Sequence, residues 1–310
     1  MITFDKLKLV ANIDAIEVID EDRFQMQVEG GRQVSLRFYQ EVPFLLMIKV
    51  DYKRREVVIE FCGKVLGKDY PKLISADTIR TCFDNINALG FCRIDIDAMM
   101  DADVVKADVT KDVYGIDPAR LTAYFGSHIS NYKMYMARKY KTGNMVIEKN
   151  VVSRKTTKRM TIYNKEREMN MAQNKNFVED NELEHIFDNA SRFELNLNSK
   201  QQVRDALRVS DNRLRNVLAS TASPIREFVE KVIEPTSNPV TMKDKKAYVT
   251  ELVLKDCDYD LEKVEAKMRE LYPTRGTNFK KVMEPYRSMM NQRACGNTDE
   301  FYTTLLEQLA

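Results

Sequence analysis

The chain has 310 residues, which is enough for one large domain or two smaller ones. Hydrophobic residues make up 44% of it and charged residues 31%, as in a water-soluble protein with a sizeable core. No apolar run approaches the ~20 residues of a membrane-spanning helix, and we expect neither a signal peptide nor a membrane partner. The five cysteines are odd in number and form no CxxC pair. They indicate reduced thiols in a cytoplasm rather than disulfides or structural zinc.

The net charge of +2 hides an uneven distribution along the chain. Residues 129–175 hold twelve Lys or Arg against three acids, whereas residues 1–100 hold fourteen against sixteen. Such a block is either a solvated face or an electrostatic footprint for phosphate. Tyrosines lie between its cations, which favours single-stranded nucleic acid, whose bases stack on aromatic rings. The expected DNA-binding residues are Lys133, Arg138, Lys139, Lys141, Arg154, Lys155, Lys158, Arg159 and Arg167.

The first part of the chain predicts short strands. Residues 23–28 and 33–38 alternate between apolar and polar side chains, and Gly30-Gly31 between them indicates a hairpin turn. Two further strands are expected at 44–50 and 56–61.

Helices and strands alternate in the middle of the chain. Ser75 or Asp77 can cap a helix that runs to about residue 89, because its apolar residues recur at helical spacing. Pro118 suits the first turn of a helix over 118–124. The other expected elements are strands at 104–113, 145–152, 158–163 and 192–197 and a helix at 179–187.

After Ser199 the pattern becomes helical. We expect a helix over 201–217, a Pro-containing linker over 234–243, and helices at about 244–256, 260–272, 277–291 and 299–309. The expected fold class is therefore α+β, with an antiparallel sheet, helices and a helical C-terminal extension. The expected parts are a β-rich region 1–75, a central region 76–233 that can form one domain with it, and a helical region 234–310.

Two of the expected strands carry an acid among apolar residues, Asp108 and Glu194. A half-buried acid needs a partner or a metal, because an unpaired buried charge is very costly. A salt bridge is the ordinary explanation for each acid alone. On neighbouring strands, however, the two carboxylates can together hold Mg²⁺ or Mn²⁺, hard cations that take oxygen ligands.

Tyr163 lies between these acids, in the basic block. A phenol, with a pKa near ~10, is a poor nucleophile at neutral pH and needs nearby positive charge or a base. Lys165 shares a face with Tyr163 if the strand continues, and Arg167 does so if a helix follows. Glu168 is either a third metal ligand or the residue that orients Lys165. The alternative tyrosines of the block are Tyr132, Tyr135 and Tyr140.

Three motifs follow one another along the chain: Asp-Val-Thr at 108–110, Ile-Tyr-Asn-Lys-x-x-Glu from Ile162, and Arg-Phe-Glu-Leu from Arg192. This ordered set resembles the replication initiators of filamentous phages (the gene II protein family) and related plasmid Rep proteins. The resemblance covers roughly residues 1–200. It implies rolling-circle replication, begun by metal-dependent nicking and rejoining of DNA through a 5′-phosphotyrosine at Tyr163.

The match departs from the family pattern at one motif. Lys106-Ala107 stands where the family has Arg-Ile. Arg93-Ile94-Asp95, by contrast, matches the family's Arg-Ile-Asp at all three positions. Asp95 is therefore the alternative to Asp108 as the first acid.

The resemblance also implies partners: single-stranded or supercoiled origin DNA, with a host helicase, a single-stranded DNA-binding protein or a second copy of the chain as further candidates. Two other functions stay open. A plasmid-mobilising relaxase would share the residues and the chemistry. A non-catalytic regulator that binds single-stranded DNA would keep the fold but not the reaction.

Overall fold

The computed structural model describes residues 1–41, 44–129, 135–149, 158–233, 245–257, 260–272, 277–294 and 298–310. The chain forms two compact units, one of Met1–Val232 with Gln308–Ala310 and one of Ile233–Glu307. The predicted α+β class is confirmed, with an antiparallel sheet, helices and C-terminal helices. The expected boundary at residue 75 falls inside the first unit.

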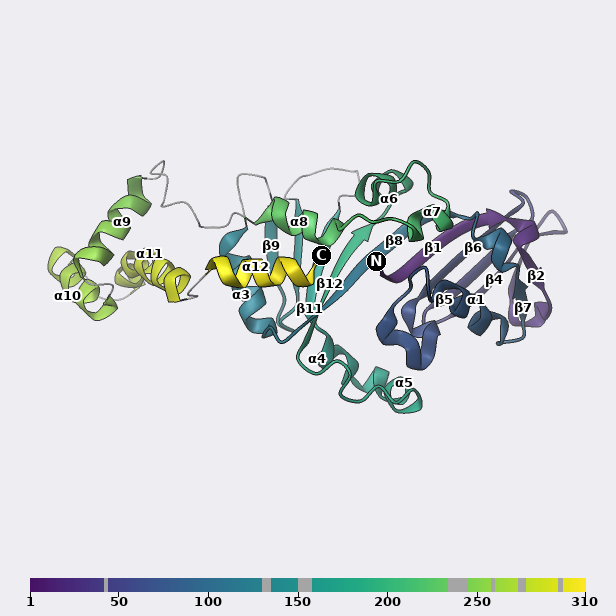
Figure 1. The fold of residues 1–310 in the computed structure, drawn as a ribbon, viewed down its shortest axis with the longest axis horizontal. Coiled ribbons are helices and arrows are strands. Elements are labelled where there is room, and N and C mark those ends of the chain that lie inside the picture. The colour runs from purple at the N-terminus through teal and green to yellow at the C-terminus, as the bar shows by residue number, and fades with distance from the viewer. Residues whose placement is uncertain are drawn as a thin grey trace. The chain divides into compact units, whose positions relative to one another are not determined.

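One ten-stranded sheet runs through the first unit in the order β3-β4-β5-β6-β1-β8-β12-β11-β10-β9 (Figure 1). In that order the strands are β3 (Gln25–Glu29), β4 (Arg32–Gln40), β5 (Leu46–Asp51), β6 (Glu56–Cys62), β1 (Phe4–Asn12), β8 (Asp103–Tyr114), β12 (Ala190–Leu197), β11 (Arg159–Asn164), β10 (Met145–Lys149) and β9 (Tyr135–Lys139). A small second sheet pairs β2 (Ile16–Val18) with β7 (Cys92–Ile94). Because β1 pairs with both β6 and β8, it joins the N-terminal hairpins to the strands of the predicted site.

The predicted β3–β4 hairpin forms, and its turn explains the two glycines. Gly30 and Gly31 both have positive φ, 56° and 76°. A two-residue hairpin turn with positive φ at both positions matches the twist of the flanking strands, and glycine adopts it without strain.

Strand alternation gives the sheet a polar face and an apolar face. On β12, Arg192, Glu194 and Asn196 share the polar face, and the residues between them share the apolar face. The helices α3 (Pro118–His128), α6 (Lys200–Leu207) and α8 (Pro224–Val232) contact the central strands, and Phe125 of α3 packs against Phe193 on the apolar face. The helix α4 (Lys165–Met169) and the 3₁₀ segment η3 (Gly63–Lys72) contact β12, β11 and β1.

The remaining described elements of the first unit are short. They are η1 (Ile13–Ala15), η2 (Glu21–Arg23), α1 (Ile79–Asn87), α2 (Ile96–Met99), η5 (Ala172–Asn174), α5 (Lys175–Asp180) and α7 (Leu214–Leu218). On α1, the predicted apolar stripe is confirmed, since Ile79, Cys82, Phe83 and Ile86 are all buried.

Two predicted helices are wrong. Residues 179–187 are mainly turns, with positive φ at Glu182 and His185, because Leu183 and Phe187 turn inward to pack around Tyr70. The helix predicted over 201–217 is interrupted, since Arg208 adopts the left-handed conformation between α6 and α7.

The second unit contains α9 (Lys245–Asp256), α10 (Leu261–Leu271), α11 (Thr277–Ala294) and most of α12 (Thr298–Gln308), which confirms the predicted helices there. Its core includes Leu254, Val264 and Met283. The linker predicted at 234–243 lies outside the described residues. No helix in the described ranges is long and apolar enough to cross a membrane.

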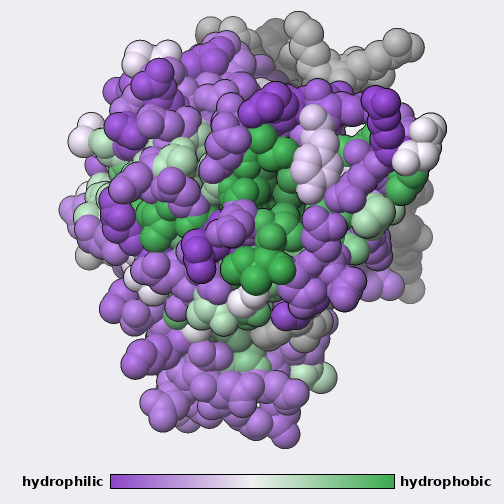
Figure 2. Space-filling view, turned by 90° about the vertical axis from the view of Figure 1, so that its right-hand side faces the viewer, coloured by the Kyte–Doolittle hydropathy of each residue, from purple (hydrophilic) through white to green (hydrophobic). Residues whose placement is uncertain are grey.

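Figure 2 looks at the end of the molecule that carries β2 and β7 and shows a mostly hydrophilic surface with hydrophobic side chains gathered near its centre. The edge strand β3 is exposed throughout, including Met26 and Val28. This edge lies far along the sheet order from β11 and β12, which carry the predicted site.

Candidate active site

Tyr163 and Glu194 meet on the polar face. Their strands, β11 and β12, pair antiparallel, with Thr161 opposite Glu194 and Tyr163 opposite Arg192. The Tyr163 Oη donates a hydrogen bond to Glu194 Oε1 at 2.6 Å. The predicted tyrosine and the second predicted acid are therefore in direct contact.

The two groups perturb each other's protonation. Burial raises the pKa of Glu194 to about 7, and the negative charge of Asp5 adds to the rise. Burial, then the charge of Glu194, raises the pKa of Tyr163 well above its ordinary value. The phenol is thus held protonated, with its proton directed at a carboxylate whose pKa is near neutrality. This is the geometry that general-base catalysis requires.

Asp108 lies on the same face, one strand away. It stands opposite Asn196 in the β8–β12 pairing, and the Asn196 side-chain amide donates to Asp108 Oδ1 at 2.7 Å. Arg159 Nε in turn donates to the Asn196 side-chain oxygen at 3.0 Å. Burial raises the pKa of Asp108, and its charge also helps to raise that of Glu194.

A third carboxylate, Asp5, was not predicted from the sequence. The register of β1 against β8 shifts between Phe4 and Lys6, which marks a β-bulge. A bulge inserts an extra residue and re-aims its side chain, and Asp5 here reaches Arg192. Burial alone would raise the pKa of Asp5, but the charges of Arg192 and Lys165 outweigh it and lower that pKa.

Arg192 holds these strands together. Its side chain is fully buried, and its Nε and Nη2 each donate to one oxygen of Asp112 at 2.7 Å. Its Nη1 donates to Asp5 Oδ1 and to Tyr70 Oη, both at 2.7 Å. Such a bidentate, charge-assisted arrangement is strong and directional, so it links β12 to β8 and β1 beneath the site.

Lys165 lies near the ring of Tyr163 and bonds to Tyr70 and Glu168. It begins α4 directly after β11, and its side chain is buried. Its Nζ donates to Tyr70 Oη at 2.7 Å and to Glu168 Oε2 at 2.5 Å, and it lies 6.0 Å from the centre of the Tyr163 ring. Glu168 was predicted either to bind metal or to orient Lys165, and these contacts match the second role.

Asp95, the alternative first acid, lies elsewhere. It caps α2 by accepting from Ala98 N at 3.1 Å, after the short strand β7. Of the two candidate acids, Asp108 is the one on the large sheet beside Glu194.

The predicted DNA-binding cations are divided between the two faces. Arg159 lies on the polar face beside Asn196. Lys158, its neighbour in sequence, lines a pocket with Leu195, Asp205 and Glu227 on the apolar side, where burial lowers its pKa. Lys139 packs against Gly126 of α3, Lys141 is in the turn after β9, and Arg138 pairs with Glu148 at 3.2 Å. Lys133, Arg154, Lys155 and the alternative Tyr132 lie outside the described residues.

Arg167 is a predicted DNA-binding cation that lies beside Tyr163. Both line a pocket of about 200 Å³, together with Thr142, Thr161 and Glu168. The alternative Tyr135 is buried in β9 against Phe228, and Tyr140 is exposed in the turn after that strand.

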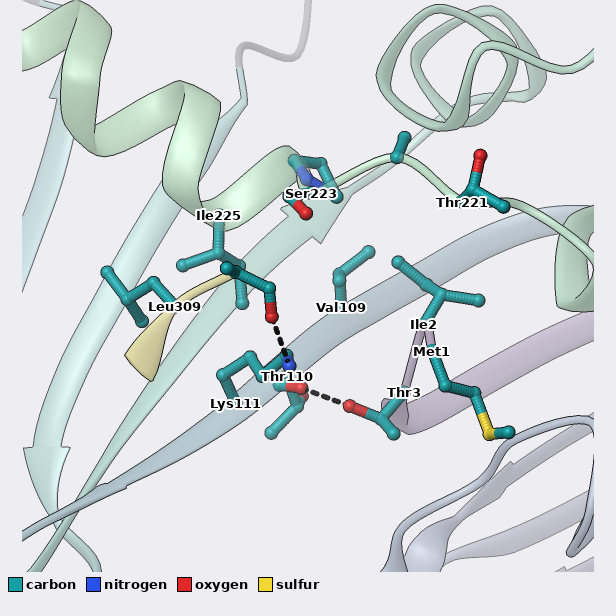
Figure 3. A pocket seen from close by; sticks show the side chains of 13 residues that line it. Met1, Ile2, Thr3, Val109, Thr110, Lys111, Thr221, Ser223, Ile225 and Leu309 are labelled. Carbon is teal, nitrogen blue, oxygen red and sulfur yellow. Dashed lines mark hydrogen bonds between the residues drawn. The ribbon is translucent and has the colours of Figure 1, made fainter. Parts of the chain in front are cut away.

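The cavity in Figure 3 has a different character. Lys111 Nζ donates to the carbonyl oxygen of Ala310 at 2.7 Å, and Thr3 Oγ1 donates to that of Thr110 at 2.5 Å. Its volume is about 40 Å³. Within the described ranges, no predicted site residue lines it, so we assign it a packing role.

The donor set on the polar face suits a hard cation. In the described part of the chain, no group of three or more His, Cys, Asp or Glu is arranged as a metal site. Asp108 and Glu194 nevertheless present oxygen donors on adjacent strands, and the charge of Asp108 helps to raise the pKa of Glu194. A divalent cation would relieve this repulsion, so the two residues fit the predicted metal.

Comparisons of the chain with protein-family models, with curated proteins and with solved structures return no match. The resemblance to rolling-circle initiators therefore rests on the three sequence motifs.

Proposed function

We propose that this chain nicks and rejoins one strand of DNA at an origin and so initiates rolling-circle replication. The observation that carries the proposal is the hydrogen bond from Tyr163 to Glu194, on a sheet face that also presents Asp108. A tyrosine whose proton points at a near-neutral carboxylate has the two features that an attacking phenol needs.

In the proposed reaction, Tyr163 Oη attacks the scissile phosphorus while its proton passes to Glu194. The bond from phosphorus to the 3′-oxygen breaks, and that oxygen takes a proton from solvent to become a free 3′-hydroxyl. The 5′-phosphate stays linked to Tyr163. The link conserves the energy of the phosphodiester, so the reverse attack by a 3′-hydroxyl rejoins the strand without ATP.

The remaining residues hold the site in place and balance the charge at the phosphate. Asp108 and Glu194 would hold Mg²⁺ or Mn²⁺, which supplies charge neutralisation at the phosphate when bound. Lys165 and Arg192, fixed by Tyr70, Glu168 and the acids, supply positive charge beneath the site. In this proposal Lys165 acts by positioning the site rather than by touching the phosphate.

The test is a nicking assay on supercoiled plasmid and on single-stranded origin oligonucleotides with Mn²⁺. Tyr163→Phe should abolish cleavage, while Tyr140→Phe, a change at an exposed tyrosine of the same basic block, should leave it intact. Cleavage that survives in Tyr163→Phe rejects the proposal.

Two alternatives make different predictions. A relaxase would cut a transfer origin with the same residues, so the substrate sequence separates it from an initiator. A non-catalytic regulator would bind single-stranded DNA equally well with Tyr163 or phenylalanine and would cut nothing. We also propose a cytoplasmic location, which suits the free thiols of Cys62, Cys82, Cys92 and Cys257. A helicase, a single-stranded DNA-binding protein and a second copy of the chain stay candidate partners.

A further inference from the structure

A second polar pocket, which we call the β1 pocket, is lined by Asp108 and by residues of the strands on both sides of β8. Its volume is about 190 Å³, close to that of the pocket beside Tyr163. The side chains that give it its charge are Lys6, Lys8, Glu60, Lys106, Asp108 and Arg159. The asparagines Asn196 and Asn198 also line it.

Strand register explains why residues so far apart in sequence meet there. Lys6 stands opposite Asp108, and Lys8 stands opposite Lys106, in the β1–β8 pairing. Asp108 in turn stands opposite Asn196 on β12. The pocket therefore spans the strands from β6 to β11 on the same face as Tyr163.

The pocket carries a net positive charge. It has four cations against two carboxylates, and Glu60 is shared by Lys6 at 2.6 Å and Lys8 at 3.0 Å. Asp108 is held by the Asn196 amide, whose oxygen is bound by Arg159. An excess of positive charge thus surrounds Asp108, one of the two acids of the proposed site. Of its four cations, Arg159 alone was among the DNA-binding residues predicted from the sequence.

We propose that the β1 pocket binds the sugar–phosphate backbone of the cleaved strand, a few nucleotides from the scissile phosphate. This inference rests on the proposed function, because the nick defines the strand. Arg159 of the β1 pocket and Tyr163 lie four residues apart on β11, so the two pockets are roughly 13 Å apart along the strands. One DNA strand laid along β11 and β12 would enter both pockets, with Glu194 between them.

Binding is measured separately from cleavage. All variants carry Tyr163→Phe, and their affinity for a fluorescent single-stranded oligonucleotide is measured by anisotropy without divalent metal, over a range of salt concentrations. The test variant is Lys8→Gln with Lys106→Gln. The matched control is Lys53→Gln with Lys72→Gln, two exposed lysines whose side chains are 59% and 65% accessible and which lie outside the pocket.

The test variant should bind roughly tenfold more weakly. Its plot of log affinity against log salt should flatten by about 0.7 for each phosphate of the single strand that the pocket no longer neutralises. The control should change neither quantity. Shortening the oligonucleotide from one end only should remove the difference between the test variant and its parent, because the pocket would lie on one side of the nick.

The inference is overturned if both double variants weaken binding equally, or if the Lys8 and Lys106 double variant does not weaken it. Either result would overturn it even if Tyr163 forms the covalent link. If no covalent link forms, but the test variant still binds more weakly and with a smaller salt dependence, the pocket is a backbone site and the nicking proposal is wrong. If millimolar inorganic phosphate saturates the pocket while the oligonucleotide does not compete with it, the pocket binds a free anion and the inference is wrong.

Discussion

At the residue scale, Glu194 carries the protonation chemistry of the site. Its pKa of about 7 follows first from burial and then from the charge of Asp5. A base works best when its pKa lies near the working pH, because it is then both deprotonated and basic enough to accept a proton. The ordinary carboxylate pKa near 4.5 would make it a much weaker acceptor for the phenolic proton.

This role sets the pH dependence of nicking. At subsaturating Mn²⁺ the single-turnover rate should rise as pH increases through about 7, because only the ionised Glu194 can bind the metal or accept the phenolic proton. Glu194→Gln should lose roughly 10²–10⁴-fold in rate and lose this pH step. A variant that cuts at the parent rate would contradict the assignment of Glu194 as the base.

The same carboxylate makes the folded protein less stable as pH rises, whereas it makes the reaction faster. Its folded pKa is raised, so the folded protein binds the proton more tightly than the unfolded chain, and stability falls as pH rises from about 4.5 to about 7. Above that window the full penalty is present. Glu194→Gln removes the charge but keeps an acceptor for Tyr163, so it should raise the free energy of unfolding by about 3 kcal/mol at pH 8.

Urea unfolding at pH 8 and pH 4 checks this prediction. The gain should be present at pH 8 and absent at pH 4, where Glu194 is protonated in both folded and unfolded chains. A loss of stability of the same size at both pH values would mean that Gln disturbs packing and that the charge is not the cause.

At the element scale, the site depends on how β1, β8 and β12 are joined by Arg192. Removing its side chain leaves Asp112 and Asp5 as buried acids without their main cation. Breaking one side of a buried ion network is far more damaging than losing an exposed pair.

Arg192→Met should therefore lower the free energy of unfolding by about 3–5 kcal/mol. The matched control is Arg80→Met, because Arg80 pairs with Asp97 on the surface, and this change should cost less than about 1 kcal/mol. Urea titration of both variants measures the difference, and equal losses would show that Arg192 has no special structural role.

The elements also explain what the sequence could predict. Hairpins and strands follow from local alternation and turn glycines, so β3, β4, β11 and β12 could be placed. Alternation could even have separated Lys158 from Arg159, because consecutive strand residues point to opposite faces. Asp5 could not have been found, because its position depends on a bulge in the non-local pairing of β1 with β8.

The two wrong helices have a related cause. Helical spacing over 201–217 is real, but Asn212 bonds to the Val104 carbonyl and fixes the chain in a turn between α6 and α7. Such tertiary contacts override local propensity, and they cannot be read from a short window of sequence. The contact of Lys165 with Tyr70 was missed similarly, since Tyr70 reaches it from outside β11, whereas its contact with Glu168 matches one of the two roles predicted for that acid.

At the scale of the whole molecule, binding and cutting should be separable. The cations on the polar face attract phosphate whether or not a metal is present, whereas the reaction needs charge neutralisation where Asp108 and Glu194 gather negative charge. Chelation with EDTA should abolish nicking and leave salt-sensitive binding to single-stranded DNA largely intact.

Asp108→Asn should act like chelation, because it keeps the shape of the side chain and removes the charge. Restoring Mn²⁺ should rescue the chelated parent and leave Asp108→Asn inactive. Nicking that continues at full rate in EDTA would reject the metal assignment while leaving the tyrosine chemistry to be tested separately.

The central claim is that Tyr163 becomes covalently joined to DNA. The direct measurement is peptide mass spectrometry of the protein after incubation with a single-stranded origin oligonucleotide and Mn²⁺. We predict a nucleotide remnant attached through a 5′-phosphate to the peptide that contains Tyr163, and its absence from Tyr163→Phe. A remnant on another tyrosine, or cleaved DNA with no covalent adduct at all, would contradict this claim.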